Sequence, residues 1–280
     1  MLPMNWTLAL REAAARMSDA GVPDAMRDGR LLLAHAMGIA PDRLTLHMHD
    51  AVDGDVHAVF TGLVAARAAR RPLSHLTGRR LFWGRGFHVS PAVLDPRPET
   101  EILVAEALRE PFSRLLDLGT GSGAIAVSLL AECPGVPGMA VDLSPDALTV
   151  ARRNATDLGV ADRLELRLSD WVAAVEGQFD LIVSNPPYIA LDEMADLSPE
   201  VLGHEPRMAL TDEGDGLACY RAIAAGAPAH LAPGGRLMVE IGPTQGAAVS
   251  ALFRQAGLED VVIHPDLDGR DRVVAARRLR

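Results

Sequence analysis

Cysteine is scarce in this chain, which has 280 residues and only two cysteines, Cys133 and Cys219. Neither has a second Cys or a His at the spacing of metal ligands, and no HExxH sequence occurs, so we expect no metal site. Two thiols so far apart in sequence also do not suggest a disulfide framework. The cysteine pattern therefore fits a protein of the reducing cytosol.

Long apolar runs are absent as well. No stretch approaches the roughly 18 uncharged apolar residues that a membrane-spanning helix needs. The first residues lack the apolar segment of a secretory signal peptide. We therefore expect a cytoplasmic protein that is neither secreted nor bound to a membrane.

Basic residues are outnumbered by acidic ones, 27 to 37, which gives a formal net charge of −10. Proteins that bind nucleic acids usually neutralise phosphates with a basic face. The acidic balance therefore argues against direct contact with nucleic acid. Hydrophobic residues make up 49% and charged residues 23%, as in an ordinary globular protein.

The first part of the chain, residues 1–75, has no strand pattern. Apolar residues recur there at three-to-four spacing, and short Gly, Pro and Asp breaks separate the segments. Asp24 and Asp55 are candidate N-caps. The pattern predicts a small helical bundle that recognises a partner or only stabilises the protein, with helices over Trp6–Met17, Asp24–Met37, Pro41–His47 and Val56–Ala69.

Residues 76–95 concentrate aromatic side chains in a chain that has only 4% of them. Leu81–Gly84 and Gly86–Val89 read as a short hairpin broken by glycine, which we expect to link two domains. The run from Arg97 to Glu101 then opens a helix predicted over Ile102–Arg109, and we expect Thr100 and Glu101 to serve the start of that helix.

The remaining domain, residues 96–280, alternates strand and helix, which predicts a doubly wound, mostly parallel sheet. The last strands are expected to add an antiparallel edge. Helices are predicted over Ala124–Ala131, Pro145–Leu158, Leu217–His230 and Thr244–Ala256. The seven predicted strands are Arg114–Leu118, Met139–Val141, Leu164–Leu168, Leu181–Ser184, Arg236–Ile241, Val261–His264 and Arg272–Ala275.

A glycine-rich turn, Gly119-Thr120-Gly121-Ser122-Gly123, joins the first strand to the first helix of this sheet. Asp142 follows about 20 residues later at the end of the next strand, which suits a carboxylate that grips the ribose hydroxyls of an adenosine cofactor. The turn also fits the dinucleotide fingerprint, so NAD is an alternative. Asp117 lies just before the glycines, and an anion there suits a cationic sulfonium cofactor better than a pyrophosphate.

The third strand ends at Ser169-Asp170-Trp171. An acid and an aromatic ring at the end of a strand can flank an adenine, with the ring stacked on the base. The alternative is a Trp packed under a loop. We expect Trp171 to contact the cofactor.

The fourth strand leads directly into Asn185-Pro186-Pro187-Tyr188, which we call the hook. Each proline fixes its φ angle and lacks an N–H, so the hook is stiff and presents free carbonyl groups. Carbonyl oxygens suit the capture of a planar NH2 group, and the ring of Tyr188 can cover its plane. The alternative is an ordinary turn after a strand. We predict that these four residues form the catalytic site.

The whole chain resembles the protein-glutamine N5-methyltransferases that modify peptide-chain release factors, the HemK/PrmC family. The resemblance includes the hook and the glycine-rich turn, which many methyltransferases share. Further matching segments make it more specific: Asp28–His35, Pro96–Glu101, Asp117–Gly123, Glu205–Leu210 and Gly214–Leu217.

The resemblance implies a class I methyltransferase domain of Rossmann-like fold that follows the helical bundle in the sequence, with S-adenosyl-L-methionine as methyl donor. The acceptor would be the glutamine of a Gly-Gly-Gln (GGQ) tripeptide in release factors, which act in translation termination. By position, Gly119 to Gly123, Asp142 and Trp171 would contact the cofactor, and Asn185 would contact both the cofactor and the substrate. We expect a monomer.

An amide nitrogen is a weak nucleophile, so the expected mechanism depends on positioning. The Asn185 side-chain oxygen and the Pro186 carbonyl would accept the two amide hydrogens and aim the nitrogen at the methyl group. Pro187 would keep the hook rigid. A DNA adenine-N6 methyltransferase, a glutamine methyltransferase of a ribosomal protein and a catalytically silent binding module remain alternatives.

Overall fold

The computed structural model describes residues 5–280, which form two compact units. The smaller, helical unit contains the described residues up to Gly78 together with Ser198–His204. The larger, catalytic unit contains Arg79–Leu197 and Glu205–Arg280. No pattern in the sequence predicts that a segment near residue 200 packs with the N-terminal helices.

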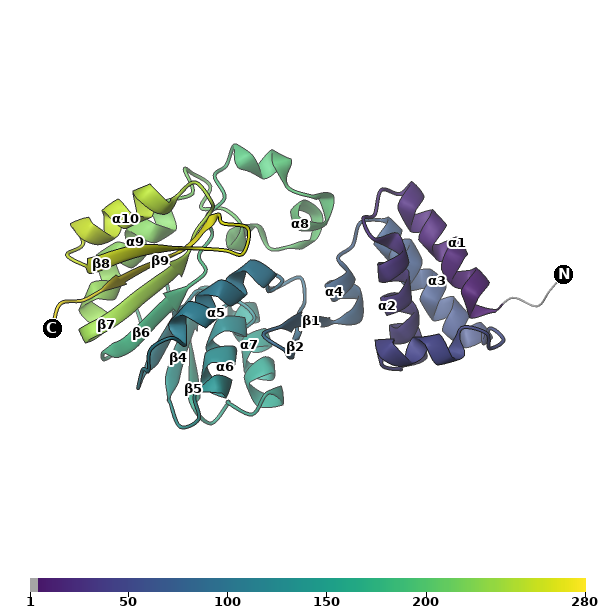
Figure 1. The fold of residues 1–280 in the computed structure, drawn as a ribbon, viewed down its shortest axis with the longest axis horizontal. Helices are drawn as coiled ribbons and strands as arrows, with labels where there is room; N and C mark the ends of the chain where they lie inside the picture. Colours follow the sequence, from purple (N-terminus) through teal and green to yellow (C-terminus); the bar gives the residue numbers. More distant parts are fainter. Residues whose placement is uncertain (1–4) are drawn as a thin grey trace. The chain divides into compact units, whose positions relative to one another are not determined.

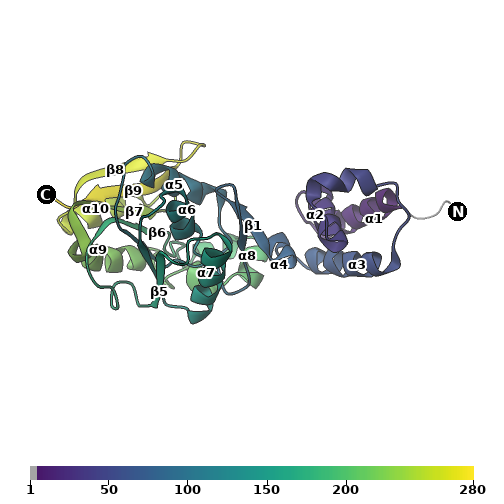
Figure 2. The same cartoon turned by 90° about the horizontal axis from the view of Figure 1, so that it is seen from below.

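The helical unit is built around three helices that pack on one another (Figure 2). Their apolar faces bury Trp6, Leu32 and Phe60 in one core, as the three-to-four spacing predicts. The elements are α1 (Trp6–Asp19), α2 (Ala25–Met37), the 3-10 helix η1 (Pro41–His47), α3 (Gly54–Ala68), α4 (Leu73–Thr77) and α8 (Pro199–His204).

The predicted N-cap at Asp55 is wrong. Asp53 caps α3, because its carboxylate accepts from the backbone N–H groups of Asp55 and Val56, both at 3.0 Å. Asp24 stands at the N-cap position of α2, but its side chain makes no capping hydrogen bond. Two acids close together in a loop look alike in sequence, and only the backbone path decides which one faces the free N–H groups.

Buried ion pairs hold α8 in the helical unit. Arg67 in α3 pairs with Asp28 in α2 at 2.8 Å and with Glu200 in α8 at 2.9 Å. Arg70 pairs with the second oxygen of Glu200 at 2.7 Å. Asp28 and Arg67 are almost completely shielded from solvent. The short helix, which has no buried residue of its own, is therefore fixed by charge rather than by apolar packing.

The catalytic unit begins with the predicted hairpin, formed by β1 (Arg79–Phe82) and β2 (Arg85–His88) around the turn at Trp83 and Gly84. Phe82 and Phe87 lie edge to face with ring centroids 5.9 Å apart and join the core of this unit. The 3-10 helix η2 (Pro98–Thr100) and helix α5 (Glu101–Ala107) follow.

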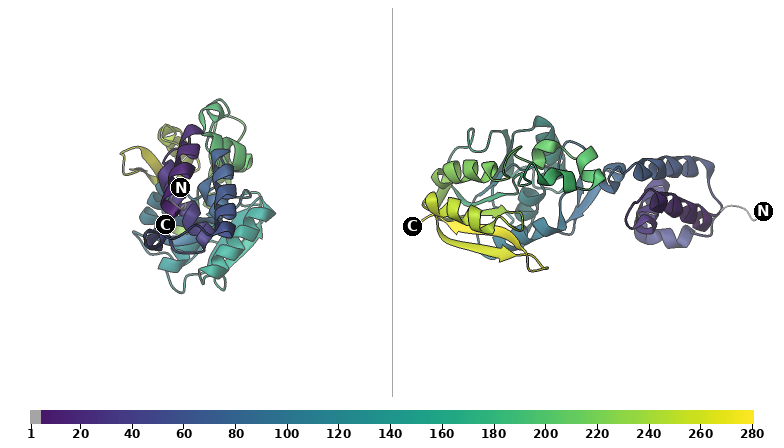
Figure 3. Two further views of the ribbon diagram at one scale, coloured as in Figure 1. Left: turned by 90° about the vertical axis from the view of Figure 1, so that its right-hand side faces the viewer. Right: turned by 90° about the horizontal axis from the view of Figure 1, so that it is seen from above.

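Seven strands form one sheet in the order β5-β4-β3-β6-β7-β9-β8. Strands β3 to β7 are parallel, and β9 is antiparallel to both of its neighbours. The predicted antiparallel contribution is confirmed, although β9 lies one position inside the edge. Figure 3 shows the C-terminal strands β8 and β9 side by side at the yellow end of the colour scale. The strands are β3 (Leu115–Leu118), β4 (Gly138–Asp142), β5 (Leu164–Leu168), β6 (Phe179–Ser184), β7 (Leu231–Glu240), β8 (Glu259–Pro265) and β9 (Asp271–Arg277).

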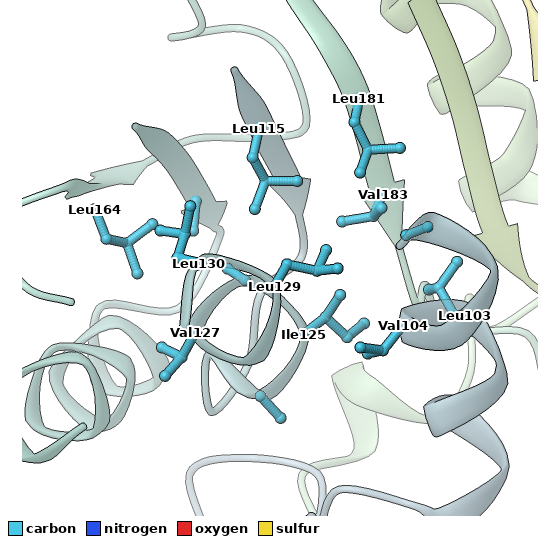
Figure 4. Packing of buried hydrophobic residues seen from close by; sticks show 14 of the residues in the cluster. Leu103, Val104, Leu115, Ile125, Val127, Leu129, Leu130, Leu164, Leu181 and Val183 are labelled. Carbon is cyan, nitrogen blue, oxygen red and sulfur yellow. The ribbon is translucent and has the colours of Figure 1, made fainter. Parts of the chain in front are cut away.

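Helices cover both faces of this sheet (Figure 1). Residues of α5, α6 and α7 share one apolar cluster with the sheet, and residues of α9 and α10 share the other. Figure 4 shows the first cluster, where Leu181 and Val183 of β6 face Leu129 and Ile125 of α6. The helices are α6 (Ala124–Glu132), α7 (Pro145–Asp157), α9 (Ala218–His230) and α10 (Gly246–Gln255), and two 3-10 turns, η3 (Glu193–Asp196) and η4 (Arg207–Ala209), precede α9.

The strand order places a crevice beside β3. From β3 the chain moves outward through β4 to β5, then returns to the other side of β3 as β6. Ligands of doubly wound sheets bind at such a switch point, outside the carboxyl ends of the strands.

Among residues 5–280, no helix has the length and apolar character needed to cross a membrane.

Candidate active site

A pocket of about 550 Å³ opens at the carboxyl ends of β3, β4 and β6. The glycine-rich turn and the hook both contribute to its wall, although more than sixty residues separate them in sequence. Of the predicted site residues, those that line the pocket are Gly119, Thr120, Gly121, Ser122, Asp142, Trp171, Asn185 and Pro187. The pocket lining does not include Gly123, Pro186 or Tyr188.

The glycine-rich turn is possible because Gly119, Gly121 and Gly123 all have positive φ angles, of 69°, 55° and 80°. Gly123 has a packing role, since a Cβ there would lie 3.2 Å from the Cβ of Ala151. It therefore lets α6 approach α7 closely at the point where α6 begins. Gly119 and Gly121 instead line the pocket, where missing side chains leave room for a ligand.

Asp142, at the end of β4, ties the turn to the sheet. One carboxylate oxygen accepts from the backbone N–H of Gly121 at 2.8 Å, and the other accepts from Ser144 at 2.8 Å. Burial raises the pKa of Asp142, and these backbone hydrogen bonds counter the effect. Each oxygen keeps free lone pairs, so the carboxylate fits the predicted contact with two vicinal ribose hydroxyls.

Asp117 is not placed as the charge argument from the sequence requires. It is fully buried in β3 and does not line the pocket. The Thr120 hydroxyl donates to one of its oxygens at 2.6 Å. Burial raises the pKa of Asp117 to about 7. This carboxyl therefore supports the turn from beneath, and its charge at neutral pH is weaker than that of an exposed aspartate.

Trp171 lies beside the glycine-rich turn. A Cβ on Gly119 would sit 3.9 Å from the indole, so the ring lies beside the turn. Its backbone takes a φ angle of 47°, and the Ser169 hydroxyl donates to its carbonyl at 2.8 Å. The ring lines the pocket next to Asp170 and also packs against the apolar layer of α9 and α10. Its predicted stacking on adenine remains a prediction.

The side-chain amide of Asn185 has a defined partner. Its nitrogen donates to the hydroxyl oxygen of Thr100 at 3.3 Å. Since the nitrogen of the amide is engaged by Thr100, the oxygen of Asn185 is the atom available to a hydrogen-bond donor in the pocket.

Tyr188 does not line the pocket. Its ring packs against the apolar layer of α9 and α10, and burial raises the pKa of its hydroxyl to about 12. Its backbone carbonyl accepts from the side chain of Gln245 at 2.9 Å. The predicted placement of this ring over the acceptor amide stays a prediction.

Several pocket residues were missed or assigned only a structural role by the sequence. Thr100, expected to serve the start of a helix, lines the pocket, whereas the Glu101 carboxylate accepts from the backbone N–H of Trp83 at 2.7 Å. Arg97 lines the pocket and pairs with buried Glu205 at 2.6 Å. Burial raises the pKa of Glu205 to about 7, and the charge of Arg97 counters it. No pattern in the sequence predicts that Arg97 and Glu205 meet, but both lie in the segments that carry the resemblance.

A further part of the pocket wall comes from the segment that leads into α9 and from the first residues of that helix. Cys219 lines the pocket at the start of α9, and burial raises the pKa of its thiol to about 11, so the thiol is neutral at pH 7. The other lining residues of this wall are Pro206, Arg207, Met208, Ala209, Thr211, Asp212, Glu213 and Ala218. This wall brings both charges and apolar atoms to the side of the pocket near the hook.

The sheet order, the glycine-rich turn after β3, the acid after β4 and the Asn-Pro-Pro-Tyr hook after β6 define a class I methyltransferase that uses S-adenosyl-L-methionine. Residues 94–217 match the methyltransferase small domain family, and residues 9–78 match the PrmC N-terminal domain family. The chain belongs to the family of release factor glutamine methyltransferases.

Individual relatives cover almost the whole chain. A release factor glutamine methyltransferase of Cereibacter sphaeroides is 61% identical over 96% of this chain and 97% of its own length. A release factor glutamine methyltransferase of Caulobacter vibrioides is 42% identical over 97% of this chain and 96% of its own length. The crystal structure of a methyltransferase from Pyrococcus furiosus has a TM-score of 0.54 at 17% identity, covers 79% of this chain and 98% of that one, and shows the fold alone.

These comparisons confirm the predicted family, fold class, enzyme class and cofactor. They give no support to the alternatives of an NAD enzyme or a silent binding module. The residue roles within the pocket are a separate matter, and they remain predictions that the geometry above makes specific.

Proposed function

We propose that this protein transfers a methyl group from S-adenosyl-L-methionine to the N5 amide nitrogen of the glutamine in the GGQ motif of peptide-chain release factors. One observation carries the proposal: the Asn185 side chain reaches the pocket at the glycine-rich turn with its nitrogen already engaged by Thr100. An amide oxygen offered in this way accepts hydrogen bonds and cannot donate them, which suits a carboxamide NH2 group.

The cofactor, when bound, supplies an electrophilic methyl group on a sulfonium. We propose that Gly119 to Gly123 give it room, that Asp142 accepts from its ribose hydroxyls and that Trp171 stacks on its adenine. The pocket volume of about 550 Å³ falls in the usual range for cofactor sites.

The hook would hold the acceptor. Asn185 Oδ1 and the Pro186 carbonyl accept the two amide hydrogens, and Pro187 keeps the hook stiff. Tyr188, whose carbonyl is bonded to Gln245, anchors the far end of the hook. The nitrogen lone pair then points at the methyl group, and rate enhancement comes mainly from this alignment.

Acceptor-only groups also favour glutamine over glutamate. A glutamate carboxylate would bring its own oxygen lone pairs against Asn185 Oδ1 and the Pro186 carbonyl, with no hydrogen to share. The same logic would apply to an exocyclic amine of adenine, so chemistry at the hook alone does not separate the two acceptors. The PrmC N-terminal domain match over residues 9–78 favours the release factor.

Mass spectrometry tests this function directly. A purified release factor is incubated with the protein and S-adenosyl-L-methionine, and its GGQ peptide is analysed. We expect a gain of one methyl group on the glutamine, and none on a release factor whose glutamine is replaced by glutamate. Parallel incubations with DNA and with ribosomal proteins decide the alternatives, because methylation of either one without methylation of the release factor would overturn the proposal.

We further propose that the enzyme works in the cytoplasm as a monomer, without direct contact with nucleic acid or membrane, because its substrate is a soluble translation factor. The helical unit would then contribute to recognition of the release factor. Size-exclusion chromatography with light scattering, alone and with the release factor, checks both the monomer and the complex.

A further inference from the structure

A second buried group stands behind Asn185 and Thr100. Glu240, the last residue of β7, is 1% exposed. The side chain of Thr100 is the hydrogen-bond partner that lowers the pKa of its carboxyl, and the carboxylate oxygen Oε2 has no partner among the described residues. Thr100 itself is buried at the end of η2. A chain of contacts therefore runs from β7 through η2 to the hook, from Glu240 to Thr100 to Asn185.

The number of available hydrogens sets the direction in which hydrogen bonds are donated along this series of contacts. An ionised carboxylate only accepts, and a hydroxyl has one hydrogen to donate. The hydrogen of Thr100 is therefore committed to Glu240, and only oxygen lone pairs are left to face Asn185. The Asn185 amide must then turn its NH2 group toward Thr100 and its oxygen toward the pocket.

Resting on the proposed function, we propose that Glu240, acting through Thr100, is a positioning residue that fixes which end of the Asn185 amide faces the acceptor glutamine. An amide side chain has nearly the same shape in its two flipped orientations, so packing alone discriminates poorly between them. The flipped orientation would present NH2 to the acceptor NH2 group and lose the bond that holds it. A buried carboxylate is the simplest group that forbids the flip.

The protonation state of Glu240 controls this arrangement. Burial raises its pKa to about 7, with Thr100 and Arg272 lowering it, Glu99 raising it and Arg97 lowering it. Two phenols, those of Tyr188 in the hook and Tyr220 in α9, also interact with it. Once protonated, Glu240 can donate to Thr100, which frees the Thr100 hydrogen for Asn185 Oδ1.

The sign of the pH effect follows. The ionised form of Glu240 holds Asn185 in the productive orientation, so turnover should rise with pH and reach its plateau above about 7. Asp117 and Glu205 titrate in the same range, since burial also raises their pKa values to about 7. A variant at position 240 is therefore needed to assign the transition to Glu240.

The test measures kcat on the release factor between about pH 5.5 and 8.5 for the wild type, Glu240→Gln, Thr100→Val and Thr100→Ser. Gln at position 240 can donate through its NH2 group, so we expect kcat at high pH to fall roughly 10- to 100-fold and the acid limb near pH 7 to flatten. Thr100→Val, which has the same shape without the hydroxyl, should show the same loss. Thr100→Ser should retain most of the activity.

Calorimetric affinity for S-adenosyl-L-methionine serves as the check of folding, and we expect it to stay within about twofold in each folded variant. Exposed Glu259, replaced by Gln, is the matched control that should leave kcat and its pH profile unchanged. Wild-type kcat with an unchanged acid limb in Glu240→Gln, or wild-type kcat in Thr100→Val, would overturn the inference. If Glu240→Gln does not fold, the comparison of Thr100→Val with Thr100→Ser decides by itself. A wild-type enzyme that methylates no glutamine would instead refute the proposed function.

Discussion

The side-chain nitrogen of Gln245 donates to the backbone carbonyl of Tyr188 at 2.9 Å, so a residue just before α10 holds the end of the hook. The same nitrogen donates to the Gly216 carbonyl at 3.1 Å, and the Gln245 oxygen accepts from the Gly242 N–H at 3.0 Å. Gly216 has to be a glycine here, because a Cβ would lie 2.4 Å from the Tyr188 carbonyl oxygen. One amide therefore joins three loops at the site.

Replacing Gln245 by Leu keeps most of the side-chain volume and removes every one of these hydrogen bonds. We expect the hook to lose its fixed position, so kcat should fall roughly 10- to 100-fold. Affinity for S-adenosyl-L-methionine, measured by calorimetry, should change little because Gln245 does not line the pocket. Exposed Gln255 at the end of α10 gives the control, Gln255→Leu, and equal kcat values in the two variants would speak against the anchoring role.

Asn185→Ala should remove most of the turnover. The variant loses the amide oxygen that accepts from the acceptor glutamine, and we expect kcat to drop on the order of 100-fold or more. Cofactor affinity should fall much less, because the glycine-rich turn and Asp142 are untouched. Steady-state kinetics on the release factor together with calorimetry separate the two effects. Turnover close to that of the wild type would defeat the proposed mechanism.

Asp142→Ala should act mainly on the cofactor. A charge-assisted hydrogen bond contributes roughly 1.5–3 kcal/mol, so the loss of this carboxylate should weaken binding of S-adenosyl-L-methionine about 10- to 100-fold. The variant also frees the Gly121 N–H that Asp142 accepts from at 2.8 Å. Calorimetry measures the affinity, and Asp146→Ala, at an exposed position of α7, is the control. Unchanged affinity in Asp142→Ala would contradict its assignment.

Asp117 predicts a pH dependence of stability. Its pKa is about 7 in the folded protein and 3.8 is its ordinary value, so between these pH values the unfolded chain releases a proton that the folded protein keeps. The free energy of unfolding therefore falls as pH rises through this window, by at most about 1.4 kcal/mol per pH unit for one group. The contribution is fully present below the ordinary value and is lost as pH passes through about 7.

Asp117→Asn should remove this contribution. Urea unfolding at about pH 5 and about pH 7 should show a smaller decrease in the free energy of unfolding for the variant than for the wild type. Exposed Asp157, replaced by Asn, should leave the decrease as it is. An identical decrease in wild type and Asp117→Asn would mean that the buried carboxyl titrates normally.

Arg67→Met should destabilise the helical unit. The change leaves the carboxylate of Asp28 buried without its partner and removes one of the two arginines that hold Glu200 in α8. Breaking a buried ion pair on one side costs about 3–5 kcal/mol. Urea unfolding followed by circular dichroism measures the loss, and exposed Arg11→Met should cost little. Adding Asp28→Leu to Arg67→Met should recover part of the stability.

The sheet was predictable because its signals are local. Short, mostly apolar runs mark β3, β4 and β6, while Leu164–Leu168 alternates apolar and charged residues, and this predicted strand agrees with β5 at both ends. Helix ends were less predictable, because the sequence predicted Asp55 as the N-cap of α3 and the structure has Asp53 there. Helix α8 could not be found from its own residues, because long-range ion pairs to Arg67 and Arg70 hold it in place.

The candidate site divides in the same way. Turn and hook have local signatures, since glycine and proline restrict or free the backbone at the residue itself. Thr100 and Glu240 have no local signature, because the role of a buried hydroxyl or carboxylate depends on which group it contacts in the tertiary structure. The sequence placed Asp117 correctly before the turn but could not show that its side chain would be turned into the core.

The sequence by itself determined the order of strands and helices, the stiff hook and the glycine-rich turn, and through the family resemblance the cofactor and the acceptor. Folding alone decided that Asn185 after β6, Thr100 of η2 and Glu240 of β7 come together. The reason is physical. Backbone preferences act between neighbours in the chain, whereas the orientation of an amide and the ionisation of a buried acid depend on atoms that only the tertiary structure brings together.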